Sequence, residues 1–256
     1  MKRNSDCKNA ALAALKGNWA KAVLAAVVVM AITYFALGPY MYSTVKVQTY
    51  VRENMDVTSS SGGLMGIFSQ SMERAMAMAQ DPEYLAIVQK AQGSSALYYL
   101  LMIFLVLPLA LGFANACLRL LTAGENDVLG NTCRIATRNY WHKVWGMFLM
   151  EVFIFLWSLL LLIPGIVKMF SYAMTPFILE ENPELSANDA IDRSRAMMKG
   201  HKFDLFWLLL SFLGWFLLSM LTLGIGLLWL MPYVQTSIAA FYEDVKADYE
   251  VNGGLI

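Results

Sequence analysis

The feature that most constrains this chain is a long stretch without charge: no Asp, Glu, Lys or Arg occurs from Leu205 to Tyr242. A single helix over this stretch would be roughly 57 Å long, whereas the hydrocarbon core of a bilayer is about 30 Å thick. One membrane span is therefore too few, and two spans joined by a tight turn fit. The segment Leu221-Thr222-Leu223-Gly224-Ile225-Gly226 supplies the turn, because glycine adopts backbone angles that other residues resist. The sequence predicts a polytopic membrane protein.

The composition agrees with this interpretation and argues against several classes of function. Hydrophobic residues make up 58% of the chain and charged residues 15%, whereas soluble domains are usually about 45–50% apolar and about 25% charged. The formal net charge is zero, so no overall basic field would attract nucleic acid. The cysteines form no CxxC pair and the histidines have no ligand-like neighbours, so we expect no structural metal site, disulfide framework or cofactor. These residues are Cys7, Cys117, Cys133, His142 and His201.

The hydrophobic pattern predicts an all-α membrane fold with about six transmembrane helices arranged as three hairpins. The expected spans are Ala22–Thr44, Ser95–Leu118, Trp145–Leu162, Ile166–Leu179, Phe206–Leu221 and Gly226–Tyr242. The fourth span is the weakest, because it is short and contains Lys168. A kinked or re-entrant segment over Val144–Leu179, giving five spans, is the alternative.

The distribution of basic residues predicts the orientation. Met1–Lys21, Arg119–Lys143 and Glu180–Lys202 are rich in Lys and Arg, and the positive-inside rule places all three in the cytoplasm. Both termini then face the cytoplasm. We expect residues 1–244 to form one integral membrane domain and residues 245–256 a C-terminal tail. Residues 45–90 would form an extracytoplasmic loop that contains a short helix.

Each cytoplasmic segment resembles an amphipathic interfacial helix that runs into a span, which suggests three related units. The clearest is Ala187–Lys199, where small and apolar residues recur at helical spacing. Ser186 and Asp189 resemble a capping box, and Gly200 would end the helix. Weaker versions occur at Ala10–Lys16 and Val128–Trp141. Basic connections at an inner leaflet often look alike without any repeat, so this remains a hypothesis.

Five charged residues are candidates for function. Glu151 lies about two turns inside the third span, where an acid could couple to protons or bind a cation. Lys168 could be its partner only in an offset hairpin; otherwise Glu151 reaches the inner interface and Lys168 the outer one. The cluster Arg193, Arg195 and Lys199 could hold anionic lipid headgroups.

The last third of the chain also carries a set of recognisable segments. They include Ile163-Pro164-Gly165, Glu181-Asn182-Pro183-Glu184-Leu185-Ser186, Met198-Lys199-Gly200-His201-Lys202 and Leu228-Trp229-Leu230-Met231-Pro232-Tyr233. With these segments the chain resembles an uncharacterised bacterial integral-membrane family, the domain of unknown function numbered nine hundred and seventy-five. It is more faintly similar to the membrane domain of some bacterial glycerophosphodiester phosphodiesterases, without their catalytic barrel. The resemblance implies a bacterial inner-membrane protein and supplies no activity or site residues.

The sequence contains no nucleophile elbow, P-loop, HExxH or paired-carboxylate motif. We therefore expect a non-enzymatic accessory or organising factor that engages membrane lipids or a partner membrane protein, and no catalytic residues. The alternative is a small transporter or channel that uses Glu151 and the proline-bearing helices around Pro108, Pro176 and Pro232.

Overall fold

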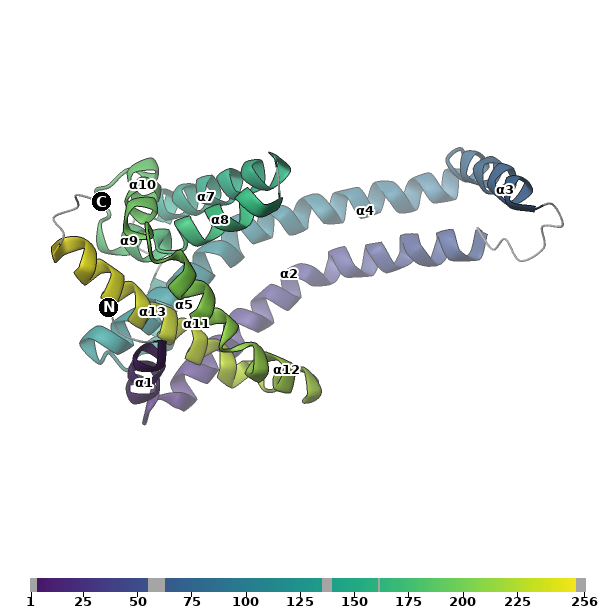
Figure 1. Cartoon of the computed structure of the whole chain (residues 1–256). Coiled ribbons are helices and arrows are strands. Elements are labelled where there is room, and N and C mark those ends of the chain that lie inside the picture. The colour runs from purple at the N-terminus through teal and green to yellow at the C-terminus, as the bar shows by residue number, and fades with distance from the viewer. Residues whose placement is uncertain (1–3, 55–62, 135–139, 161, 252–256) are drawn as a thin grey trace. The chain divides into compact units, whose positions relative to one another are not determined.

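The computed structural model describes residues 4–54, 63–134, 140–160 and 162–251, and this part of the chain is helical throughout apart from turns (Figure 1). The elements are α1 (Asn4–Leu15), α2 (Trp19–Asn54), α3 (Gly63–Met78), α4 (Pro82–Leu101), the π-helix η1 (Met102–Val106), α5 (Leu107–Ala123), α6 (Val128–Cys133), α7 (Tyr140–Leu160), α8 (Leu162–Tyr172), α9 (Thr175–Glu181), α10 (Ala187–Met197), α11 (Lys202–Leu210), α12 (Leu213–Leu221) and α13 (Leu227–Val251). The predicted all-α class is confirmed.

Four helical stretches of the described chain are long and apolar enough to cross a membrane. They are Trp19–Asn54, Pro82–Ala123, Tyr140–Leu159 and Lys202–Leu221. Three of them contain an expected span in full, and Tyr140–Leu159 contains most of Trp145–Leu162. The expected span Ile166–Leu179 is instead divided between α8 and α9, and Gly226–Tyr242 lies in α13, which carries polar residues at its centre.

The chain divides into two compact units, one of which is Ala31–Met102. In this unit the later part of α2 runs antiparallel to α4, and the rings of Tyr40 and Tyr98 stack with centroids 5.1 Å apart. The Tyr50 hydroxyl donates to Asp81, which also accepts from the Glu83 amide at 2.8 Å and begins α4. Residues 45–90 are therefore more regular than the loop with one short helix that the sequence suggested. Of these, 55–62 lie outside the described residues.

The second unit contains Met1–Met30 and Ile103–Ile256. In it, α7 and α8 form a tight antiparallel hairpin. Gly165 of α8 lies so close to α7 that a Cβ on it would stand 2.8 Å from the Ser158 Cα. Only glycine permits this approach of two helix backbones. Val144–Leu179 therefore does not form a single kinked helix.

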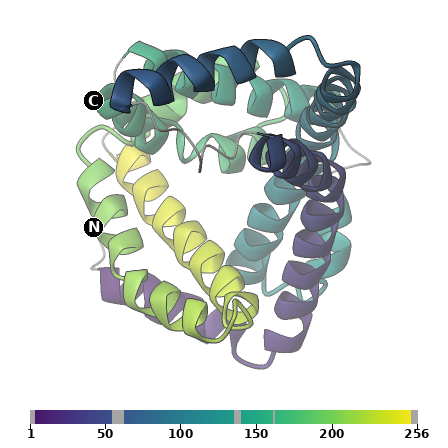
Figure 2. The ribbon, with the colours of Figure 1, turned by 90° about the vertical axis from the view of Figure 1, so that its right-hand side faces the viewer.

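A second hairpin follows, in which α11 and α12 lead into α13 (Figure 2). The chain bends between α11 and α12, and the turn after α12 places Leu223 and Gly224 at positive φ, 53° and 86°. Polar contacts join the ends of each hairpin that lie opposite its turn: Lys143 forms an ion pair with Glu180 of α9, and His201 Nε2 lies within hydrogen-bonding distance of Asp248, at 3.2 Å. Because α13 continues to Val251, residues 245–251 are helical rather than a loose tail. Residues 252–256 lie outside the described part.

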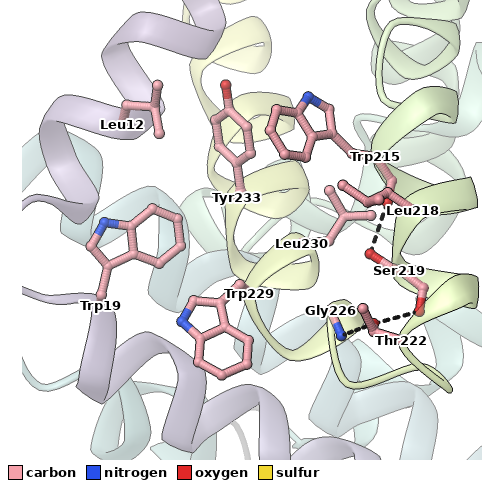
Figure 3. Close-up of a pocket in the computed structure, with 10 residues that line it drawn as sticks. All are labelled: Leu12, Trp19, Trp215, Leu218, Ser219, Thr222, Gly226, Trp229, Leu230 and Tyr233. Atoms are coloured by element: carbon pink, nitrogen blue, oxygen red, sulfur yellow. Dashed lines mark hydrogen bonds between the residues drawn. The ribbon is translucent and has the colours of Figure 1, made fainter.

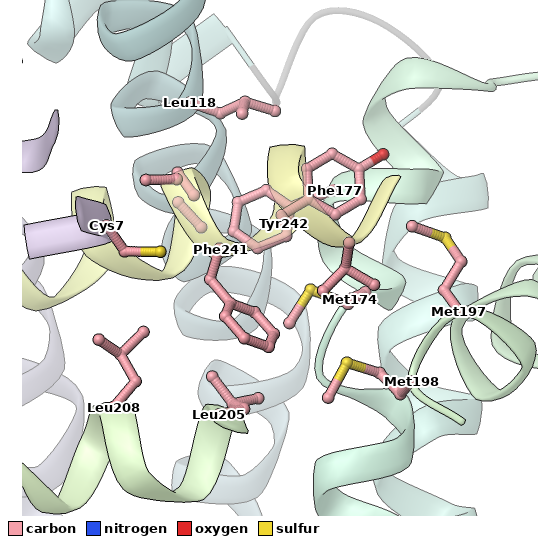
Figure 4. Packing of buried hydrophobic residues seen from close by; sticks show 14 of the residues in the cluster. Cys7, Leu118, Met174, Phe177, Met197, Met198, Leu205, Leu208, Phe241 and Tyr242 are labelled. Atoms are coloured by element: carbon pink, nitrogen blue, oxygen red, sulfur yellow. The ribbon is translucent and has the colours of Figure 1, made fainter. Parts of the chain in front are cut away.

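The main core of this unit gathers buried side chains from α1, α9, α10, α11 and α13 (Figure 4). At its centre the rings of Phe177 and Tyr242 stack with centroids 4.9 Å apart. Cys7 brings α1 into the same core, next to the α13 side chains. The core fixes α1 along α13, and this placement creates the site described next.

Candidate functional site

A cavity of about 480 Å³ lies between α1, the start of α2, α12 and α13 (Figure 3). Its volume falls within the range of known ligand pockets. Three indole rings and a phenol ring supply much of its wall, and leucines supply most of the rest. The lining residues are Leu12, Trp19, Trp215, Leu218, Ser219, Thr222, Gly226, Trp229, Leu230 and Tyr233.

The serine and threonine hydroxyls in the wall already form hydrogen bonds with the backbone. Ser219 Oγ donates to the Trp215 carbonyl at 2.8 Å, and Thr222 Oγ1 donates to the Ser219 carbonyl at 2.8 Å. Thr222 Oγ1 also accepts from the Gly226 amide at 3.0 Å. These bonds stabilise the turn between α12 and α13 and leave the cavity surface largely apolar.

A row of aromatic contacts holds α1 and α2 against the second hairpin. The Trp19 ring meets Tyr233 edge-on at 6.5 Å, and Tyr233 meets Phe212 edge-on at 5.0 Å. Lys8 of α1 ends the row, with its Nζ 4.3 Å from the centre of the Phe212 ring. The same Nζ donates to the Ser211 carbonyl at 3.2 Å, at the bend between α11 and α12. The cavity wall is therefore tied together from α1 to α13.

This geometry corrects one part of the expected topology. The six-span layout places Trp19 and Gly226 at opposite faces of a core roughly 30 Å thick. In the structure both line one cavity, Trp19 contacts Tyr233, and Tyr233 lies only about 10 Å along α13 from Gly226. The turns after α1 and after α12 therefore lie near each other, at the same end of this unit. No local pattern in the sequence predicts this proximity, because the packing of α1 along α13 joins residues far apart in the chain.

A charged cluster lies at the opposite end of the hairpins and centres on two adjacent carboxylates of α9. Glu180 binds Arg119 of α5 at 3.3 Å and also binds Lys143 of α7, whose side chain is only 5% exposed. Its neighbour Glu181 accepts from the Tyr242 hydroxyl at 2.6 Å and from Lys246 at 2.7 Å. Desolvation lowers the pKa of Lys246, but the hydrogen bond and charge of Glu181 outweigh it and raise that pKa overall. The pair thus joins α5, α7 and α13 to α9.

Sequence reasoning missed Glu180 and Glu181 as important residues. The available signal was two consecutive acids directly after an apolar stretch, in a chain whose neighbouring segments are basic. Because both partners of Glu180 lie far away in sequence, the pattern alone did not identify them.

The five predicted charged residues do not form one site. Glu151 is exposed on α7, and no ion pair within the described chain joins it to Lys168. The Lys168 Nζ lies 4.4 Å from the centre of the Trp157 ring. Arg193 donates to Asn182 Oδ1 at 3.3 Å, whereas Arg195 pairs with Asp192 on the surface and Lys199 is exposed after α10.

The helix predicted at Ala187–Lys199 is α10, and its cap is as expected. Ser186 Oγ accepts from the Asp189 amide at 3.2 Å, and Gly200 has a φ of +91°. Its apolar stripe is buried within the protein, however. Ser194 shows the reason: its hydroxyl donates to the Ser171 carbonyl at 3.0 Å and accepts from the Met174 amide at 3.2 Å, so it bridges the break between α8 and α9. This stripe is not open to lipid.

The related helices expected near residues 10 and 128 differ in extent. The first lies in α1, which begins at Asn4. The second is represented by α6, a short helix that ends at Cys133, and residues 135–139 of the expected stretch lie outside the described residues. Within the described chain, no three His, Cys, Asp or Glu side chains gather where they could hold a metal ion.

Comparison with known proteins gives one match. Residues 159–249 match the model of the family described as "Protein of unknown function (DUF975)". The match covers α8 to α12 and most of α13, and so includes Glu180, Glu181 and the α12–α13 wall of the cavity, but not Leu12 or Trp19. No curated protein and no solved structure matches the chain. The resemblance to the membrane domain of glycerophosphodiester phosphodiesterases stays a prediction.

Proposed function

We propose that this protein is a non-enzymatic membrane protein that binds a membrane lipid, with an acyl chain of that lipid in the cavity between α1, α2, α12 and α13. The observation that carries the proposal is the apolar, aromatic wall of this cavity, whose only hydroxyls besides that of Tyr233 are bonded to the backbone. The role that fits is that of an accessory factor that engages lipid.

An unfilled apolar cavity lowers the stability of the folded protein. Atoms that line an apolar void lose dispersion contacts on one side, and water does not replace them. Lipid tails are the apolar molecules available in a bilayer, and they are as apolar as leucine. A tail that enters the cavity therefore restores these dispersion contacts. The hydrophobic effect adds nothing to this binding, because the tail moves from one apolar environment to another.

We also propose that the protein lies in a bacterial inner membrane with the charged ends of its hairpins in the cytoplasm. The basic residues Arg119, Lys143 and Lys246 gather at that end, whereas the turns at Gly165 and Gly224 contain no charged residue themselves, and basic residues favour the cytoplasmic side. In this orientation the start of α1 and the end of α13 lie toward the cytoplasm. The exposed Arg195 and Lys199 would be open to a partner membrane protein.

Native mass spectrometry of the protein released from lipid nanodiscs tests the lipid proposal. Leu12 lines the cavity from α1 and is 43% exposed, so Leu12→Trp places a ring in the cavity while disturbing little else. We expect the wild-type protein to retain lipid and this variant to retain much less. Ala13→Trp adds the same ring on the neighbouring exposed position, which does not line the cavity, and should retain lipid like the wild type. Equal retention in all three proteins would contradict the proposal.

A further inference from the structure

We infer that the lipid in this cavity is an anionic phospholipid whose phosphate is held by Lys16 and Lys21. The inference rests on the proposed lipid function and adds the chemical class of the ligand. An acyl chain cannot by itself distinguish one phospholipid from another, because all have similar tails. Any selectivity must come from groups at the edge of the cavity.

The two sequence stretches that line the cavity carry charges of one sign. Every lining residue belongs to one of two stretches, residues 7–52 and 205–242, and neither contains Asp or Glu. Lys16 lies in the turn between the lining residues Leu12 and Trp19, and Lys21 follows Trp19 by two residues. Both lysines are exposed. The nearby Lys8 is engaged by the Ser211 carbonyl and the Phe212 ring, so it is not included in this site.

The cavity also presents hydrogen-bond donors. The Tyr233 hydroxyl and the indole N–H groups of Trp19, Trp215 and Trp229 make no hydrogen bond within the described part of the chain. In Figure 3 the Tyr233 hydroxyl points toward the end of the cavity that Leu12 and Trp215 border. Tyrosine and tryptophan side chains with one apolar and one polar end are suited to the zone between lipid tails and headgroups. Ester carbonyls of a phospholipid would accept from these donors.

Together these groups match an amphipathic anion of a defined shape. The tail lies among the leucines and indole faces, the ester groups lie near the aromatic donors, and the phosphate lies near the two ammonium groups. Lysine binds phosphate as a point charge, so a zwitterionic lipid, whose own cation competes, is held less well. Attraction of anionic lipid to a basic residue near the membrane surface corresponds to roughly fivefold per lysine.

The test uses nanodiscs that contain equal amounts of phosphatidylglycerol and phosphatidylcholine. Native mass spectrometry gives the ratio of the two lipids retained by the full chain. We expect the wild type to retain phosphatidylglycerol with a preference of about tenfold or more, and the double variant Lys16→Gln, Lys21→Gln to retain both lipids nearly equally. Lys199→Gln removes an exposed lysine that does not border the cavity, and it should keep the wild-type ratio.

The outcomes separate the two proposals. Retained lipid without a preference for phosphatidylglycerol, or a preference that the double variant keeps, would overturn the headgroup inference and leave the acyl-chain proposal in place. A wild-type chain that retains no lipid, or that carries a second copy of itself in place of lipid, would overturn both. Circular dichroism of the variants checks that the helices are intact, so that a change in ratio reports the site.

Discussion

Gly226 lies directly against Ser219 across the turn that joins α12 to α13: a Cβ on Gly226 would stand 2.7 Å from the Ser219 Oγ and 2.9 Å from its Cα. The same contact, with the same spacing along the chain, joins Gly165 to Ser158 in the hairpin of α7 and α8. In both hairpins the serine hydroxyl donates to the carbonyl one helical turn before it. The two hairpins thus share the same glycine–serine contact beside their turns, which supports a related origin for these two hairpins.

This contact predicts that an added methyl group forces the helices apart. Gly226→Ala and Gly165→Ala should each lower the free energy of unfolding by about 1–3 kcal/mol, the usual cost of overpacking, because the nearest atoms include backbone. The measurement is unfolding in detergent micelles with increasing denaturing detergent. Gly214→Ala is the matched control, because nothing lies within 4 Å of its added Cβ. Gly214 lies in α12, so this change should be neutral or slightly stabilising. An equal loss in all three variants would contradict the close contact.

The Lys143–Glu180 pair gives a second prediction. Lys143 is 4% exposed, so Glu180→Gln would leave a buried ammonium without its carboxylate. We expect a loss of about 3–5 kcal/mol in the free energy of unfolding. The double variant Lys143→Met, Glu180→Gln should recover most of this loss, since the uncompensated charge is gone. A double-mutant cycle measures the coupling.

The control for that cycle is the exposed pair of Arg195 and Asp192, whose side chains are 54% and 61% exposed. Asp192→Asn should change the free energy of unfolding by less than about 1 kcal/mol, because water and salt screen such pairs. If Glu180→Gln proves as mild as Asp192→Asn, the carboxylate is not the link between α5, α7 and α9 that the geometry indicates.

The Tyr50–Asp81 hydrogen bond predicts a pH dependence in the unit Ala31–Met102. The Tyr50 hydroxyl, followed by the Glu83 amide, lowers the pKa of Asp81 below its usual value of 3.8. Because the folded-state pKa is the lower one, this stabilisation is fully present above pH 3.8 and is lost as the pH falls through the folded-state pKa. The protection factors of the amides at the start of α4 against hydrogen exchange should therefore fall in acid. Tyr50→Phe should move this transition to higher pH, and an unmoved transition would count against the bond.

Lys8 provides a fourth prediction, on how α1 is held. Lys8→Met keeps the length of the side chain but removes the bond to the Ser211 carbonyl and the charge over the Phe212 ring. A cation over an aromatic ring and a charged hydrogen bond each contribute on the order of 1 kcal/mol. We expect faster hydrogen exchange in α1 and unchanged exchange in α7. Lys16→Met, at an exposed position, should leave both unchanged in detergent.

The sequence predicted the local features and missed the distant ones. The turn at Gly224, the cap at Ser186 and the left-handed Gly200 in the turn after α10 follow from neighbouring residues, and all three are present in the structure. The continuation of α2 to Asn54 went unpredicted, because polar residues past Thr44 end a hydrophobic pattern without ending a helix. The contact of Trp19 with Tyr233 and the partners of Glu180 join residues far apart in sequence, and no periodicity records such contacts.

The candidate site illustrates the same limit. The sequence places the aromatic residues of this site within or just before the expected spans, where aromatic side chains are common. Their convergence depends on how α1 packs along α13 and on the bend after Leu210. Conversely, Glu151 stood out as an acid within a span, and the structure leaves it exposed on α7. The pattern of hydrophobic residues thus identifies apolar helices well. It does not identify the site, which depends on how these helices pack.

The most direct test of the central claim is photo-crosslinking with a phospholipid that carries a diazirine in one acyl chain, followed by mapping of the modified peptides. The account predicts saturable labelling of cavity residues such as Leu12, Leu218 and Leu230, which excess unlabelled phosphatidylglycerol suppresses and Leu12→Trp abolishes. Labelling that never saturates and falls only on exposed residues outside the cavity, such as Phe155 of α7, would show that no acyl chain occupies the cavity.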